Sequence, residues 1–170
     1  MEREFDFYQE GKRYEELLLE HGPIEIPGYA EMAAKVDALE THVVADAAGK
    51  CLNHNDFFAL NFLIDEHDKY YLIDWEYAGM SDYANDFGTF CVCCQLDEDE
   101  VDLRLSPTSA IRPRSRKRGT AWPISSSLAG RWYLWALLKE AEGDHVGEWL
   151  YIYYSYADKY LDRVLAMYEG

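Results

Sequence analysis

Residues 51–79 read CLNHNDFFALNFLIDEHDKYYLIDWEYAG, and this stretch decides how the rest of the chain is interpreted. It surrounds two short apolar runs with two histidines, three asparagines and four aspartates. The apolar runs at 62–64 and 70–73 predict two strands, and the polar residues 65–69 predict the turn between them. We therefore expect a β-hairpin framed by polar side chains.

This hairpin brings together polar residues that are distant in the sequence. Asp56 and Asn61 precede its first strand and Asp74 follows its second, so the three should converge at one end. Carboxylate and carboxamide oxygens are hard ligands that suit Mg²⁺, which also keeps water and phosphate oxygens. A carboxylate that is not bound to the metal can accept a proton from a substrate hydroxyl. Kinases divide the work of phosphoryl transfer in this way.

Two motifs in this stretch resemble a known family. H-N-D-x-x-x-x-N at 54–61, followed by I-D-W-E-Y-A-G at 73–79, resembles the catalytic and metal-binding segments of the choline kinase and aminoglycoside phosphotransferase group. W-E-Y-A-G and a later W-x-x-W resemble the choline/ethanolamine kinase branch, including bacterial choline kinases. The resemblance covers about 1–103 and 128–170. It implies an α+β, mainly α fold: the C-terminal lobe of a protein-kinase-like fold, with a short hairpin carrying the catalytic and metal residues.

The resemblance also implies a role for each polar residue. Asp56 would be the catalytic base and His54 would orient its loop, although a core histidine is the alternative for His54. Asn61 and Asp74 would bind Mg²⁺, and ATP would supply the phosphate. Asp86, in Y-A-N-D-F-G, would be a buried structural carboxylate that holds the catalytic loop.

An aromatic wall is expected opposite these residues. Trp132 and Trp135 share one helical face and resemble the W-x-x-W that lines the choline pocket of the family. Aromatic faces attract a quaternary ammonium by up to about 2 kcal/mol each when desolvated. Tyr153 and Tyr156 are further substrate-binding candidates, and Glu76 would supply a counter-charge. Plain core packing is the alternative for these aromatic residues.

Helices are predicted elsewhere from apolar spacing and from glycine and proline stop signals. The predicted ranges are 8–21, 31–45, 83–95, 132–141 and 148–167. Ser81 and Asp82 are expected to cap the third of these helices, and the acidic segment 97–102 is expected to be exposed. The chain 1–170 is long enough for a single domain with its own core.

Charge and composition narrow the possible partners. The net charge of −16 argues against nucleic acid and anionic membranes and favours a cation, or an anion bridged by a divalent metal. Choline is the expected substrate, and an aminoglycoside polycation is the alternative. There is no apolar run of about 18 residues that would span a membrane, and the acidic start does not resemble a signal peptide. The crowded cysteines at 91–94 do not fit a disulfide framework, so we expect a cytoplasmic protein.

The segment 104–127 departs from this composition. From 104 to 131 there is no acidic residue, whereas seven of the 16 basic residues of the chain lie there. We interpret 104–127 as a basic Ser/Pro/Arg-rich insert or linker, as a phosphate-capturing patch, or as a tract put out of frame by two compensating frameshifts.

The N-terminal lobe of the resembled family is expected to be absent. That lobe covers the nucleotide with a glycine-rich loop and a lysine. Neither is recognisable before His54, because Lys12, Lys35 and Lys50 lie in or beside predicted helices. Two hypotheses follow. The chain is a phosphotransferase lobe completed by an N-lobe in trans, or a non-catalytic relic that binds a small amine or a protein partner.

Overall fold

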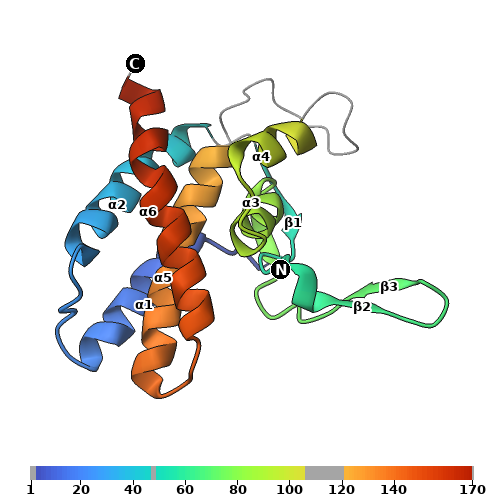
Figure 1. Cartoon of the computed structure of the whole chain (residues 1–170), viewed down its shortest axis with the longest axis horizontal. Helices are drawn as coiled ribbons and strands as arrows, with labels where there is room; N and C mark the ends of the chain where they lie inside the picture. The colour runs from blue at the N-terminus through green and yellow to red at the C-terminus, as the bar shows by residue number, and fades with distance from the viewer. Residues whose placement is uncertain (1–2, 47–48, 106–120, 170) are drawn as a thin grey trace.

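The computed structural model describes residues 3–46, 49–105 and 121–169. Figure 1 shows a helical body with two small two-stranded sheets on one side. The elements are, in chain order, α1 (Phe7–Glu20), α2 (Tyr29–Asp46), β1 (Lys50–Asn53), the short 3-10 helix η1 (Ala59–Asn61), β2 (Phe62–Ile64), β3 (Tyr70–Leu72), β4 (Gly79–Asp82), α3 (Asn85–Cys93), α4 (Glu98–Leu105), α5 (Ala121–Glu142) and α6 (Gly147–Glu169). The fold is therefore mainly helical α+β, as predicted.

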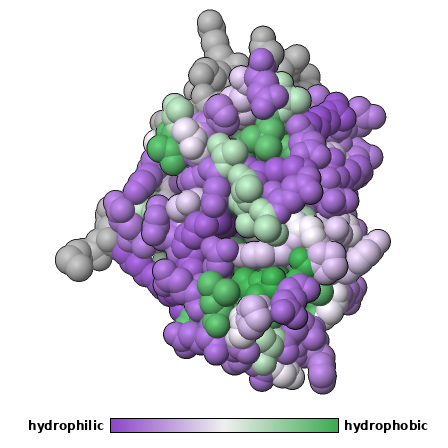
Figure 2. All heavy atoms as spheres, turned by 90° about the vertical axis from the view of Figure 1, so that its left-hand side faces the viewer, coloured by the Kyte–Doolittle hydropathy of each residue, from purple (hydrophilic) through white to green (hydrophobic). Residues whose placement is uncertain are grey.

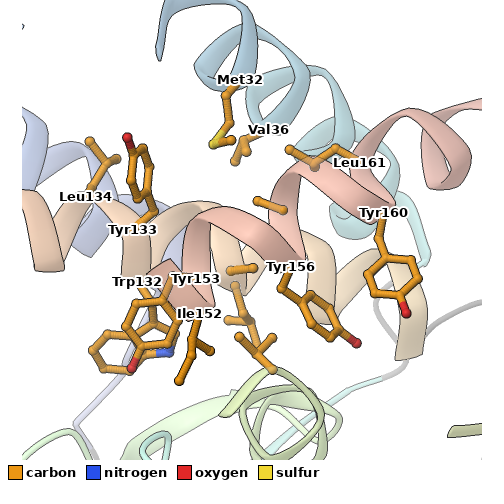
Figure 3. Packing of buried hydrophobic residues seen from close by; sticks show 14 of the residues in the cluster. Met32, Val36, Trp132, Tyr133, Leu134, Ile152, Tyr153, Tyr156, Tyr160 and Leu161 are labelled. Carbon is orange, nitrogen blue, oxygen red and sulfur yellow. The ribbon is translucent and has the colours of Figure 1, made fainter. Parts of the chain in front are cut away.

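The core lies around the long helices α5 and α6, which pack side by side. Helices α1, α2 and α3 all pack against α5. Figure 3 shows how buried side chains from α2, α5 and α6 meet in this core. The labelled residues are Met32, Val36, Trp132, Tyr133, Leu134, Ile152, Tyr153, Tyr156, Tyr160 and Leu161.

A glycine sets the distance between α2 and α5. A Cβ added to Gly130 would lie 2.4 Å from Cγ2 of Val36, which is closer than non-bonded carbon atoms can approach. The two helices can therefore pack at this distance only because position 130 has no side chain.

The predicted hairpin is present as β2 and β3, with Leu63 opposite Tyr71. It projects from the helical body (Figure 1). A second antiparallel pair, β1 with β4, was not predicted. In that pair Asn53 lies opposite Gly79, so the β1–β4 sheet closes the base of the loop that contains the hairpin.

The structure corrects several predicted boundaries. Helix α5 begins at Ala121 rather than 132, so 121–127, expected as part of a linker, is helical. Arg104, at the other end of that expected segment, belongs to α4, and 106–120 lie outside the described residues. Helix α4 itself was not predicted, and Val101 on it is buried.

The start of α3 also differs from the prediction. Ser81 lies in β4 and does not cap the helix. Asp82 accepts a hydrogen bond from the Ala84 N–H at 2.9 Å, in the turn before the helix begins at Asn85.

The molecular surface is largely polar. Figure 2 shows a face on which hydrophilic residues predominate and hydrophobic residues form small groups. Across the described part of the chain, no helix combines the length and the apolar character needed to cross a membrane.

Candidate functional site

The loop that begins at His54 is anchored by Asp86, in the first turn of α3. One carboxylate oxygen accepts the His54 N–H at 3.0 Å, and the other accepts the Asn55 N–H at 2.6 Å. Asn55 is fully buried with φ +67°, a conformation that side-chain-bearing residues rarely adopt. Its side chain accepts a hydrogen bond from Ser81 Oγ at 2.6 Å. The carboxylate and the buried amide together hold this unusual backbone in place.

The His54 side chain links the loop to the end of the hairpin. It is 1% exposed, and Nε2 lies 2.7 Å from the Ile73 carbonyl oxygen. Its Nδ1 accepts a hydrogen bond from the Asp56 N–H at 3.3 Å. Because Nδ1 accepts, we assign the proton to Nε2, which donates to Ile73. A neutral imidazole in this position orients the backbone of Asp56 relative to the strand that leads to Asp74.

Asn61 fixes the carboxylate of Asp56. Its side-chain nitrogen donates to Oδ2 and to the backbone carbonyl of Asp56, both at 2.8 Å. The Asn61 carbonyl accepts the Ile73 N–H at 2.9 Å, which ties Asn61 to the residue before Asp74. The nitrogen of the Asn61 amide is therefore used inside the loop, and the amide oxygen is the atom suited to a metal.

Three acidic side chains interact at this end of the hairpin. Burial raises the pKa of the Asp56 carboxyl, the Asn61 hydrogen bond and the nearby His54 lower it, and the negative charges of Asp74 and Glu76 raise it. Asp74 is exposed and adopts φ +61°. Oxygen ligands and accumulated negative charge fit a hard cation such as Mg²⁺. Among the described residues, no three His, Cys, Asp or Glu side chains form a metal-binding group, so a metal here would also need Asn61 and outside ligands.

Three of the expected wall residues, Trp132, Trp135 and Tyr153, form one aromatic cluster. Trp132 and Tyr153 are buried, with ring centroids 6.1 Å apart and planes inclined by 23°. Trp135 is only partly buried and meets Trp132 edge to face at 5.9 Å. Burial raises the pKa of Tyr153, and the nearby thiol of Cys93 and the negative charge of Asp56 add to the rise. Tyr153 therefore connects the cluster electrostatically to the Asp56 carboxylate.

Tyr156 is not part of that cluster. It is 4% exposed, and its ring lies against that of Tyr160 with centroids 4.7 Å apart. Cys91 and Ser125 also interact with it. Figure 3 shows Trp132 and Tyr153 together, with Tyr156 pointing to a different part of the core. The structure therefore brings three of the four expected aromatic residues together and places Tyr156 in the packed interior.

Sequence reasoning missed two parts of this region. Trp149 stacks on Tyr153 at 5.9 Å and meets Phe58 edge to face at 5.2 Å. Its spacing of four residues from Tyr153 on a helix was the available signal. Ser81 was missed as a support of the loop because its contact with Asn55 depends on the β1–β4 pairing.

Comparisons with known sequences agree with the motifs. A family model described as the phosphotransferase enzyme family matches residues 2–114. The chain is 27% identical over 124 residues to Protein LicA of Haemophilus influenzae. That match covers 68% of this chain and 43% of the relative. The chain therefore spans less than half the length of this curated relative.

Solved structures share the fold. Choline kinase LicA from Streptococcus pneumoniae superposes with a TM-score of 0.79 and 26% identity, covering 95% of this chain and 56% of that one. A structure of LicA in complex with AMP gives a TM-score of 0.78 at 24% identity, with 95% and 55% coverage. A choline/ethanolamine kinase family protein from Mesorhizobium loti gives 0.68 at 23% identity, with 98% and 56% coverage. The chain corresponds to just over half of each structure.

Proposed function

Because the chain belongs to the phosphotransferase enzyme family, we propose that it is a lobe that transfers the γ-phosphate of ATP to the hydroxyl of a small amino alcohol, with choline as the expected substrate. One observation carries the proposal. Asn61 holds the Asp56 carboxylate at 2.8 Å in a loop anchored by Asp86, at the end of the hairpin where Asp74 lies.

In this mechanism Asp56 accepts the proton of the substrate hydroxyl as its oxygen bonds to the γ-phosphorus of ATP, while the bond from that phosphorus to the β–γ bridging oxygen breaks and ADP leaves. The Asn61 amide nitrogen keeps the accepting carboxylate in position, and His54 orients the backbone of Asp56. The Asn61 amide oxygen and Asp74 would hold Mg²⁺, which supplies positive charge at the phosphates when it is bound. Most of the catalysis in such reactions comes from positioning and charge, and these residues provide both.

The aromatic cluster supports a cationic substrate. Trp132 and Tyr153 are buried, so Trp135, which is partly exposed, is the ring best able to present a face to an ammonium group. Cation–π attraction to such a ring complements the acidic side chains of Asp74 and Glu76. If the quaternary ammonium group of choline lay between Trp135 and the carboxylates of Asp74 and Glu76, the hydroxyl group of choline could extend toward Asp56.

Exposed apolar side chains on and beside the hairpin form a surface that a further polypeptide segment could cover. Leu60, Leu63, Ile64 and Trp75 are between 50% and 69% exposed. The matched structures are almost twice as long as this chain. We propose that a polypeptide segment corresponding to the part of those relatives that this sequence does not match covers this apolar surface and completes the nucleotide site.

The test is phosphocholine formation from choline and Mg-ATP, followed by mass spectrometry. The chain is assayed alone and with the N-terminal half of the S. pneumoniae choline kinase added as a separate polypeptide. Asp56→Asn should lower the rate by about 10²–10⁴-fold, the usual contribution of a general base. Asp68→Asn is the matched control, because Asp68 lies on the exposed turn of the hairpin at φ +58°, which Asn tolerates.

Turnover that survives Asp56→Asn would remove Asp56 from the mechanism. Absence of turnover under both conditions, at any protein concentration, would contradict phosphotransfer by this chain. Calorimetric titration with choline, with and without Mg-ATP, then tests the second hypothesis: choline binding without nucleotide binding would identify a non-catalytic amine-binding module. The same assay with an aminoglycoside in place of choline tests the alternative substrate.

A further inference from the structure

The chain before α1 contains an extended segment that pairs with β4. Residues 3–5 run parallel to β4, with Glu4 bridged to Met80. The Met80 N–H donates to the Arg3 carbonyl at 2.8 Å, and the Phe5 N–H donates to the Met80 carbonyl at 3.1 Å. We call residues 3–5 the strap.

The strap lies close to β4 at a glycine. A Cβ added to Gly79 would be 2.9 Å from the Arg3 carbonyl oxygen and 2.9 Å from Cβ of Phe5. Both distances are too short for atoms that are not bonded to each other. The close approach of the strap to β4 therefore depends on the missing side chain at this position.

The side chains of the strap alternate between two directions, as they do in any extended segment. Two of them reach the loop between β3 and β4. The Arg3 guanidinium donates to the Glu76 carbonyl at 2.6 Å, and the Phe5 ring meets the Tyr77 ring edge to face, with centroids 5.9 Å apart. Glu4, between them, pairs instead with a lysine of β1 at 3.1 Å. One side of the strap therefore contacts the loop that carries Glu76.

This loop needs support from outside. Asp74 adopts φ +61°, a conformation that side-chain-bearing residues rarely adopt unless their surroundings hold them in it. Past that residue, within the described ranges, one further hydrogen bond from outside the loop reaches its backbone, from Asn55 Nδ2 to the Tyr77 carbonyl at 2.9 Å. Arg3 and Asn55 therefore hold the consecutive carbonyls of Glu76 and Tyr77 from two different segments of the chain.

We propose that Arg3 is a positioning residue for the candidate site. By fixing the Glu76 carbonyl, it holds the carboxylates of Asp74 and Glu76 where the proposed metal ion and ammonium group would bind. The inference rests on the proposed function, which gives these two carboxylates their binding roles. Arg3 contacts neither ligand in this role and acts through the backbone of the loop.

A positioning role and a simple charge effect predict opposite changes when Arg3 is removed. Arg3→Ala takes one positive charge away from a loop that carries two carboxylates. Coulomb attraction alone would therefore make the site bind a cation more tightly. If Arg3 holds the carboxylates in place, its removal should instead weaken the binding of a cation.

The experiment is titration of the whole chain with Mn²⁺, a paramagnetic substitute for Mg²⁺, in which electron paramagnetic resonance measures the free ion. In Arg3→Ala the Mn²⁺ affinity should fall by about three- to tenfold. This is less than the roughly 10–100-fold loss that is typical when a residue bonded directly to a metal ligand is replaced. Arg3→Lys, which keeps the charge and an N–H donor, should retain most of the affinity. Calorimetric titration with choline should rank the variants in the same order.

Two further variants separate position from charge. Arg163→Ala is the matched control, because Arg163 is exposed on α6 and pairs with an acidic residue of α4. It makes the same change of charge in a contact between two helices, so the Mn²⁺ affinity should not fall. Gly79→Ala leaves the charge unchanged but pushes Arg3 away from β4, so it should weaken Mn²⁺ binding. Hydrogen exchange in residues 74–78, followed by mass spectrometry, should be faster in Arg3→Ala and Gly79→Ala and unchanged in Arg163→Ala.

The outcomes distinguish this proposal from the proposed function. If Arg3→Ala binds Mn²⁺ as tightly as the unaltered chain, or more tightly, the positioning role is wrong and the proposed function stands. If the unaltered chain binds neither Mn²⁺ nor choline, the proposed site itself is contradicted, and the role of Arg3 falls with it. Faster exchange of the loop together with weaker Mn²⁺ binding would support the positioning role.

Discussion

At the scale of single residues, Asp86 is the side chain that anchors the backbone of the catalytic loop. Its two carboxylate oxygens accept consecutive backbone N–H groups, at His54 and at the left-handed Asn55. Two acceptors on one rigid group fix the peptide plane between these residues. Asp56 is the next residue in the chain, so this contact also determines the position of its backbone.

Asp86→Ala should therefore be strongly destabilising. It leaves two buried N–H groups without acceptors, at about 1–3 kcal/mol each, so we expect the free energy of unfolding in urea to fall by about 2–4 kcal/mol. Asp99→Ala, an exposed residue of α4, is the control and should change stability by less than about 0.5 kcal/mol. Equal stability of the two variants would show that the carboxylate does not hold the loop.

At the scale of elements, the packing of α2 on α5 depends on Gly130. Gly130→Ala places a methyl group 2.4 Å from Val36, and the helices must separate or Val36 must move, at a cost of about 1–3 kcal/mol. In Gly147→Ala, at the start of α6, the nearest atom lies at 3.8 Å, so this control should be neutral or slightly stabilising. Thermal unfolding of both variants, and of Gly130→Ala combined with Val36→Ala, tests the contact. The double variant should recover part of the loss.

The cysteines of α3 should be unreactive in the folded chain. Burial raises the pKa of the Cys91 and Cys93 thiols to about 12, so at pH 8 almost none of either is the reactive thiolate. Iodoacetamide should label both only after unfolding in urea, and their labelling in the native state should increase as the pH approaches 12. Cys51, on the β1 strand, is partly exposed and serves as the comparison. Rapid native labelling of Cys91 at pH 8 would contradict the packing of α3.

Elements with a local signal were predictable, and those that depend on distant partners were not. The β2–β3 hairpin was visible because its turn and both apolar runs are contiguous. The β1–β4 pair was not, because its strands are short and Asn53 meets Gly79 only across the intervening loop and hairpin. The start of α5 was hidden because Ser125, Ser126 and Ser127 are buried without contributing apolar periodicity.

The same distinction applies to the candidate site. The spacing of H-N-D-x-x-x-x-N predicted that Asp56 and Asn61 lie together, and the structure shows their side chains hydrogen-bonded. The roles of these residues and of Asp74 stay predictions. Helical periodicity could not distinguish residues of the aromatic wall from residues of the packed core, because Tyr153 and Tyr156 share the buried face of α6. Only the neighbouring elements decide that Tyr153 interacts with Cys93 and feels the charge of Asp56, whereas Tyr156 interacts with Cys91.

At the scale of the whole molecule, the chain is strongly acidic, but the β2–β3 hairpin that projects from it is apolar. The net charge is −16, and Figure 2 shows a predominantly hydrophilic face. The hairpin instead exposes Leu63 and Ile64 on an unpaired two-stranded sheet. Exposed apolar strands with free edges favour association between chains.

Replacing Leu63 and Ile64 with Ser and Thr should reduce self-association without lowering the stability of the fold. Sedimentation velocity over a range of concentrations measures association, and urea unfolding measures stability. Leu103→Ser, an exposed apolar residue on α4, is the control and should not alter association. If the hairpin variant sedimented like the unaltered chain at every concentration, the exposed surface of the hairpin would not mediate self-association.

The pairing of β1 with β4 has a consequence for exchange between related proteins. Asn53 and Gly79 are opposite each other in one ladder, so the segment between them leaves the scaffold and returns to it at neighbouring points. The segment therefore has a fixed pair of connection points, but its loop also depends on Asp86 of α3. A graft of this segment into a relative should keep its geometry only where the recipient has a carboxylate at the position of Asp86.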